Sequence, residues 1–218
     1  MDTPLITSGN DSMPVFVNRQ NLMGLVNFSS LLDKISINGA PPVVTSSGPT
    51  SPPALIAPGI ADAVFAARLG DPAHLDENAY SAAADDATGQ LSTVLSRKLA
   101  EAGIDPSPFT LTQDADGTVR VKGDHPDKAK IEQLFADDPA LTRDYCIIAG
   151  MSEGLAMSQL NKNFAQAWRA DTDVAARTQV WNSAVAKYNV LDATHEEMRW
   201  DGAKLVSVDR TYMQQAGA

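Results

Sequence analysis

The segment Gly150-Met151-Ser152-Glu153-Gly154 is the part of the sequence whose spacing best matches a catalytic motif. It fits Gly-x-Ser-x-Gly, in which the glycines permit a strained turn that exposes the nucleophilic serine of a hydrolase. Such an enzyme needs an acid and then a histidine after the serine. These could be supplied by Asp171, Asp173 or Asp192 as the acid, with His195 as the base. Serine hydrolysis, written most simply with Ser152, Asp192 and His195, is therefore one alternative function.

The surroundings of this motif favour a different structure. A nucleophile elbow lies at the end of a strand in a parallel sheet, but residues 60–144 contain no succession of apolar strand-like runs. Asp138-Pro139 instead has the pattern of a helix start, because Asp caps a first turn and Pro fits its first position. A helix beginning there would run into Tyr145 and include Ser152. Two glycines in such a helix would allow close packing rather than catalysis.

Other site chemistries have weaker support. Asp114-x-Asp116-Gly117 resembles part of a calcium loop, but Thr112 and Gly123 occupy two essential ligand positions, so a turn is expected. The histidines at 74, 125 and 195 have no partner one helical turn away, as zinc sites usually require. Cys146 stands alone in an apolar run without a cationic neighbour, which is typical of a buried small side chain. No metal or cofactor is expected.

Composition narrows the classes of partner. The 218-residue chain carries 27 acidic and 17 basic residues, for a net charge of −10. An acidic surface repels phosphate backbones, so nucleic acid is not an expected partner. No stretch approaches the length of about 18 apolar residues that a membrane span needs. The N-terminus lacks the features of a cleaved Sec signal, which leaves a cytoplasmic protein or one exported without such a signal, and we expect a bacterial source.

Residues 1–59 differ from the rest of the chain. Residues 1–70 hold eight of the 13 prolines but only four acids and three bases. Proline fixes φ and removes backbone donors, so the stretch from Gly39 to Gly59 is predicted to be extended. Upstream, seven large apolar residues would surround a helix instead of forming one stripe: Leu22, Leu25, Val26, Phe28, Leu31, Leu32 and Ile35. Together with the apolar run Val15, Phe16 and Val17, these are the residues expected to make the interaction.

Residues 60–218 are predicted to form a predominantly helical α+β domain. Helices are expected over residues 60–69, about 73–102 with a possible break at Gly89, from Asp124, from Asp138, and after an Asp171 cap. Alternating residues around Asp114–Gly117, and again around Trp200–Ala203, predict two hairpins that could share a small antiparallel sheet. Thr194-His-Glu-Glu197 matches a capping box at the start of another helix.

The contrast between an apolar arm and an acidic body indicates an interaction function. Apolar surface of this size is expected to lie against protein, either on the same domain or on a neighbour. We therefore expect a non-enzymatic structural or assembly protein that self-associates, or binds a protein partner, through residues 15–59. Serine hydrolysis at Ser152 is one alternative. An exported protein with an uncleaved N-terminal secretion signal is the other.

Overall fold

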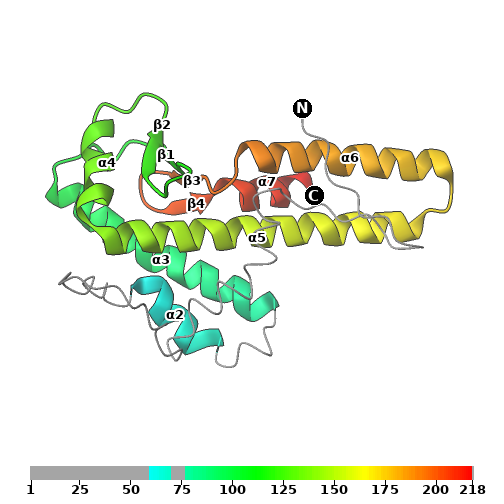
Figure 1. Ribbon diagram of the computed structural model, residues 1–218, viewed down its shortest axis with the longest axis horizontal. Coiled ribbons are helices and arrows are strands. Elements are labelled where there is room, and N and C mark those ends of the chain that lie inside the picture. Colours follow the sequence, from blue (N-terminus) through cyan, green and yellow to red (C-terminus); the bar gives the residue numbers. More distant parts are fainter. Residues whose placement is uncertain (1–58, 70–76, 218) are drawn as a thin grey trace, which may run out of the picture.

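The computed structural model describes residues 59–69 and 77–217, and the predicted arm lies outside this part of the chain except for Gly59. The described residues form six helices and four strands, and two of the helices, α5 and α6, make a long hairpin (Figure 1). In chain order these are α2 (Ile60–Leu69), α3 (Glu77–Glu101), β1 (Phe109–Gln113), β2 (Val119–Lys122), α4 (Lys128–Asp137), α5 (Pro139–Ala170), α6 (Val174–Ala193), β3 (Met198–Trp200), β4 (Leu205–Ser207) and α7 (Val208–Ala216).

The four strands form one antiparallel sheet in the order β2-β1-β3-β4. Both hairpins were predicted, and their union in one sheet is confirmed by the pairing of β1 with β3, where Phe109 lies opposite Trp200 and Leu111 opposite Met198. Along β2 the buried Val119 and Val121 alternate with exposed residues, because successive side chains of a strand point to opposite faces. One face of the sheet is therefore core. The prediction of a predominantly helical α+β fold is confirmed.

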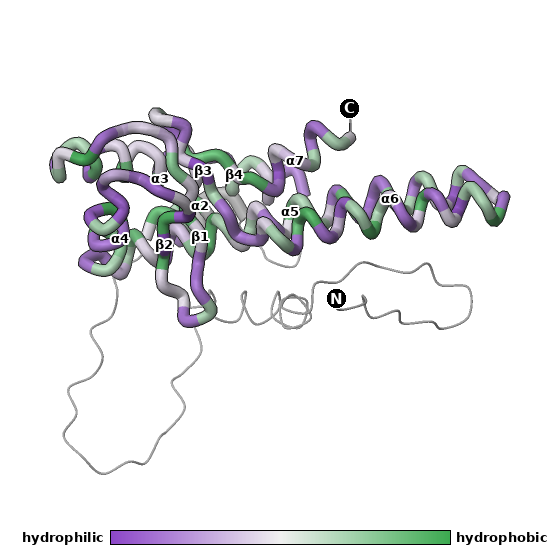
Figure 2. Tube along the Cα trace, turned by 90° about the horizontal axis from the view of Figure 1, so that it is seen from above, coloured by the Kyte–Doolittle hydropathy of each residue, from purple (hydrophilic) through white to green (hydrophobic). Residues whose placement is uncertain are grey.

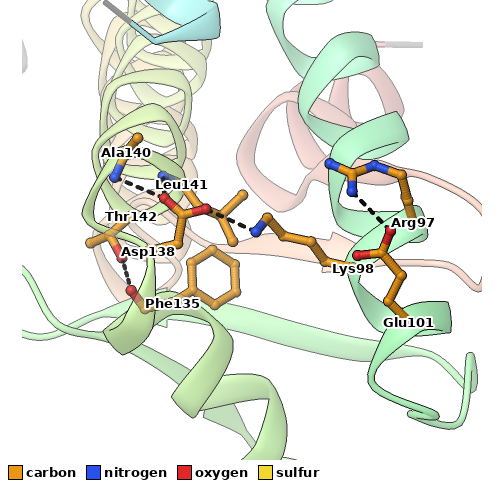
Figure 3. A network of polar contacts seen from close by, with 8 residues as sticks. All are labelled: Arg97, Lys98, Glu101, Phe135, Asp138, Ala140, Leu141 and Thr142. Carbon is orange, nitrogen blue, oxygen red and sulfur yellow. Dashed lines mark hydrogen bonds and ion pairs between the residues drawn. The ribbon is translucent and has the colours of Figure 1, made fainter. Parts of the chain in front are cut away.

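Helix α5 begins where the Asp138-Pro139 pattern predicted it. The Asp138 carboxylate accepts hydrogen bonds from the main-chain nitrogens of Ala140, at 3.1 Å, and Leu141, at 3.0 Å. The same carboxylate pairs with Lys98 Nζ at 2.9 Å, which ties the end of α3 to the start of α5 (Figure 3). The hydrogen bond to Lys98 is the main reason that the pKa of Asp138 is lowered, and the main-chain bonds of the cap add to this effect. Asp138 thus both caps α5 and joins this helix to α3.

The buried apolar residues fall into two clusters that share α5. The larger cluster joins the sheet to α2, α3, α4 and the first half of α5. The smaller cluster joins the second half of α5 to α6 and α7, and contains Leu160, Phe164, Tyr188 and Met213. Figures 1 and 2 show the ends of α5 and α6 extending beyond the rest of the body as a helical hairpin. The smaller cluster therefore stabilises a part of the protein that the sheet does not support.

Two local predictions about helix bounds were wrong. Helix α3 runs through Gly89 without a break, because buried residues such as Ala87 and Leu91 pack on both sides of it. Asp173, not Asp171, caps α6, since its carboxylate accepts from Ala176 N at 2.9 Å. Asp171 instead follows the last residue of α5.

The predicted capping box at Thr194 was also wrong, because this segment ends one helix and does not start another. Thr194 follows the last residue of α6, and its hydroxyl lies 2.9 Å from the carbonyl oxygen of Val190. Glu196 has a φ of 56°, in the left-handed region, which turns the chain into β3. Helix α7 was not predicted at all. Its cap is Ser207, whose hydroxyl accepts from Arg210 N at 3.2 Å.

Candidate functional site

Ser152 lies in the middle of α5, not in a turn between a strand and a helix. Residues 145–149, which the hydrolase alternative would make a strand, are helical. The side chain of Ser152 is buried, with 1% of its surface exposed, and its hydroxyl has no hydrogen-bond partner within the described residues. His195 lies in the turn after α6, and the exposed Asp192 lies in the last turn of that helix. The hydroxyl is therefore not activated by a histidine in this arrangement.

His125 has a structural role in the loop before α4. Asp127 N donates to its Nδ1 at 3.1 Å, so the ring proton lies on Nε2, which is 2.9 Å from Ser107 Oγ. The ring also packs edge-on against Phe109. His74 lies outside the described residues. Within the described ranges, no group of three or more His, Cys, Asp or Glu side chains is placed to hold a metal ion.

The Asp114–Gly117 segment forms the turn that its residue types predict. Asp114 N donates to Thr118 O at 2.9 Å, and Gly117 has a φ of 86°, which glycine adopts at little cost. Asp116 accepts from Thr118 N, and this bond is the main reason that its pKa is lowered. Cys146, in the same region, has a pKa raised to about 11 by burial. A thiol with that pKa is a poor nucleophile at neutral pH.

The most specific polar arrangement lies where the chain enters the body, at the start of α2. This helix has Gly59 in front of it, which offers no side chain to cap the first free N–H groups. Asp144 of α5 takes that place: its two carboxylate oxygens accept from Ile60 N at 2.9 Å and Ala61 N at 3.1 Å. The Asp144 side chain is 4% exposed. A carboxylate at a helix N-terminus also interacts favourably with the helix dipole.

A second contact stabilises the same junction. Asp62, in the first turn of α2, accepts from Gly59 N at 2.9 Å and forms an ion pair with Arg143. Arg143 and Asp144 are neighbours on α5, so two successive side chains of one helix bind the first turn of another. We call Gly59, Asp62, Arg143 and Asp144 the arm anchor, because residues 1–58 precede it directly.

Sequence reasoning did not find the arm anchor. Gly59 is not among the side chains that signal a helix cap, and Asp144 lies 84 positions from Ile60 in the sequence. The ten apolar residues predicted to make the interaction, from Val15 to Ile35, lie outside the described residues. The one available signal was Asp62, an acid in the first turn of a predicted helix.

A buried group of acids lies between α5, β3 and α7. Asp209 is 1% exposed, Glu153 is 5% exposed and Glu197 is 8% exposed. Lys122 Nζ pairs with Glu197 at 2.5 Å. Burial raises the pKa of Asp209 to about 7, and the neighbouring Glu153 and Glu197 add to this effect. The cluster is therefore a point at which the charge of the interior depends on pH.

Comparisons with known protein families, with curated proteins and with solved structures found no match to this chain. Among the described residues, no helix combines the length and the apolar character required to cross a membrane.

Proposed function

We propose that this protein is a non-enzymatic interaction or assembly protein, whose residues 15–59 pack on a neighbouring copy of the chain or on a protein partner. The observation that carries the proposal is the arm anchor. Asp144 and Arg143 hold the first turn of α2 on α5, so the residues that precede Gly59 start from a fixed point of the body.

A fixed starting point favours an arm that binds. Proline-rich chain is already extended before binding, so it loses little conformational entropy when it lies against a surface. The arm also contains large apolar residues with few charges, which is unusual for a solvated tail. The first turn of α2, which follows these residues, is held on α5 by a buried carboxylate.

Ser152 and His125, the two polar side chains considered above for catalysis, add no competing assignment. The hydroxyl of Ser152 lacks the histidine partner that nucleophilic catalysis needs, and His125 is held by main-chain and serine contacts. Self-association or partner binding therefore remains the function that best accounts for both the arm and its anchor.

Full-length protein with charges in the arm provides the test. Leu25→Asp together with Leu32→Asp places two carboxylates among the apolar residues of the arm. Ala175→Asp together with Asn182→Asp, at exposed positions of α6 outside residues 15–59, adds two carboxylates to the body and is the control pair. Size-exclusion chromatography with light scattering should show an oligomer for the wild type and the control pair, and a smaller species for the leucine pair.

A chain that begins at Gly59 extends the test, because it retains the arm anchor. It should be monomeric. If the wild type and both pairs are monomers of equal stability at working concentration, the arm does not mediate self-association. If the wild type is a monomer that the leucine pair alone destabilises, the arm packs on its own domain and the proposal is wrong.

A further inference from the structure

A pocket of about 260 Å³ opens where α3, α5, β4 and α7 meet. It lies between the two hydrophobic clusters, because α3 and β4 contribute to the larger one and α7 to the smaller one. Its wall is rich in hydroxyl groups and has no aromatic side chain. The wall residues that matter below are Gly89, Ser92, Ser152, Lys204, Ser207 and Arg210.

Most hydroxyls around this pocket already serve the fold. Thr88 donates to Ala84 O at 2.6 Å, and Ser92 donates to Thr88 O at 2.7 Å. Ser92 Oγ also accepts from Leu205 N at 2.9 Å, which links α3 to the sheet. Ser152 differs from them, because its buried hydroxyl has no partner among the described residues. The oxygen of this hydroxyl has less than 1 Å² of accessible surface, so Ser152 marks the floor of the pocket but its hydroxyl does not itself contact an occupant.

The charged groups of the pocket favour a negatively charged occupant. Lys204 and Arg210 contribute two cations to the wall, and Asp85 contributes one acid. Arg210 pairs with Asp85 at 2.6 Å and donates to Ser81 at 3.3 Å, so its guanidinium is held in place. The guanidinium has five N–H groups, and these two bonds to described residues use two of them. Such a pre-positioned fork is suited to carboxylate or phosphate oxygens.

Gly89 leaves space beside these groups. It lies in the interior of α3, where glycine is less favourable than alanine, yet a β-carbon there would meet no atom within 4 Å. Packing therefore does not require the glycine. Its absence of a side chain keeps one wall of the pocket open.

We propose that this pocket binds a small molecule carrying an oxyanion, with Arg210 and Lys204 meeting its charge. Its volume is below the range typical of drug-sized ligand sites, so the occupant is small. Arg210 and Gln214 also line a neighbouring groove of about 580 Å³, in which the remainder of a longer ligand would lie.

Amide chemical shifts of the full-length protein provide the test, with inorganic phosphate, glycerol 3-phosphate and glycerol as probes at constant ionic strength. We expect saturable shifts at Gly89, Ser152 and Leu205 with both phosphates, and none with glycerol. A tighter response to glycerol 3-phosphate would show that the site reads the attached carbon chain, and equal responses would show that it reads the oxyanion alone. Absence of saturable shifts at these amides with either phosphate would overturn the proposal.

Two variants of matched chemistry separate binding from folding. Gly89→Leu fills the pocket, and Gly154→Leu adds the same side chain to an exposed helical glycine that does not line it; neither new β-carbon meets an atom within 4 Å. The phosphate response should fall at least tenfold in Gly89→Leu and in Arg210→Gln, and persist in Gly154→Leu. A response that survives in Gly89→Leu would place the binding elsewhere.

Discussion

Gly59 lies so close to Asp144 that a β-carbon on residue 59 would overlap the Asp144 carboxylate. This contact explains why a residue without a side chain precedes α2. The carboxylate that would normally come from the capping residue itself comes from a distant helix, and it needs the space that glycine leaves. The junction between the predicted arm and the body is thus specified by two residues that are far apart in the sequence.

Replacing Asp144 by alanine should therefore destabilise the start of α2. The change leaves the main-chain nitrogens of Ile60 and Ala61 without their acceptor, and loss of a helix cap costs about 1–2 kcal/mol. Urea unfolding should show this loss, and hydrogen exchange should show that the amides of α2 lose protection first. Asp124→Asn, at an exposed position, is the control and should change the free energy of unfolding by less than about 0.5 kcal/mol. Equal effects of the two changes would contradict the capping role.

The carboxyl of Asp209 should make the protein more stable in mild acid. Thr194 Oγ1 lies 2.6 Å from Asp209 Oδ1 and 2.9 Å from Val190 O, so one hydroxyl proton faces two acceptors. A protonated Asp209 resolves this conflict by donating to the hydroxyl. Because burial raises its pKa to about 7, the folded protein holds a proton that the unfolded chain releases above about pH 4.

Stability from Asp209 is fully present below the unfolded pKa and is lost as the pH rises through about 7. Lowering the pH from 8 to 5 should raise the free energy of unfolding by an amount on the order of 2 kcal/mol. Asp209→Asn removes the titration, so the difference between wild type and variant in the free energy of unfolding should change over this interval. Parallel curves for the two proteins would show that Asp209 is already ionised in the folded state.

The sequence predicted those elements whose signals are local. The alternation of Leu111, Val119 and Val121 with polar residues reflects one buried face of the sheet, and the Asp138-Pro139 start of α5 depends on adjacent residues. These signals can be recognised in the sequence because the residues that produce them are neighbours in the chain.

The remaining features depend on contacts between distant residues. No pattern near Gly59 shows that Asp144 will cap α2. Thr194 has the residue types of a capping box around it, yet its hydroxyl contacts Asp209 of α7, a helix of nine residues whose short apolar pattern was not recognised. Asp171, the predicted cap, follows the last residue of α5, so the cap of α6 falls on Asp173 instead.

Ser152→Ala should leave the free energy of unfolding unchanged or raise it by up to about 1 kcal/mol, because it removes a buried hydroxyl that has no partner in the described chain. Ser92→Ala is the matched control. Its hydroxyl bonds to both Thr88 O and Leu205 N, so its loss should lower the free energy by about 1–2 kcal/mol. A fluorophosphonate probe should not label the wild type. Selective labelling that disappears in Ser152→Ala would establish the hydrolase alternative instead.

Phe164→Ala should loosen the projecting end of the α5–α6 hairpin more than the sheet. Phe164 is 3% exposed and contacts the rings of Trp168 and Trp181, so its truncation removes the centre of the smaller cluster. Large-to-small changes of this kind cost about 3–5 kcal/mol. Because the larger cluster does not include these residues, hydrogen exchange should accelerate in the distal parts of α5 and α6 while the amides of β1 and β2 stay protected. Val174→Ala, in the same hairpin but 78% exposed, should change neither region. Uniform loss of protection across the sheet would show that the two clusters unfold as one unit.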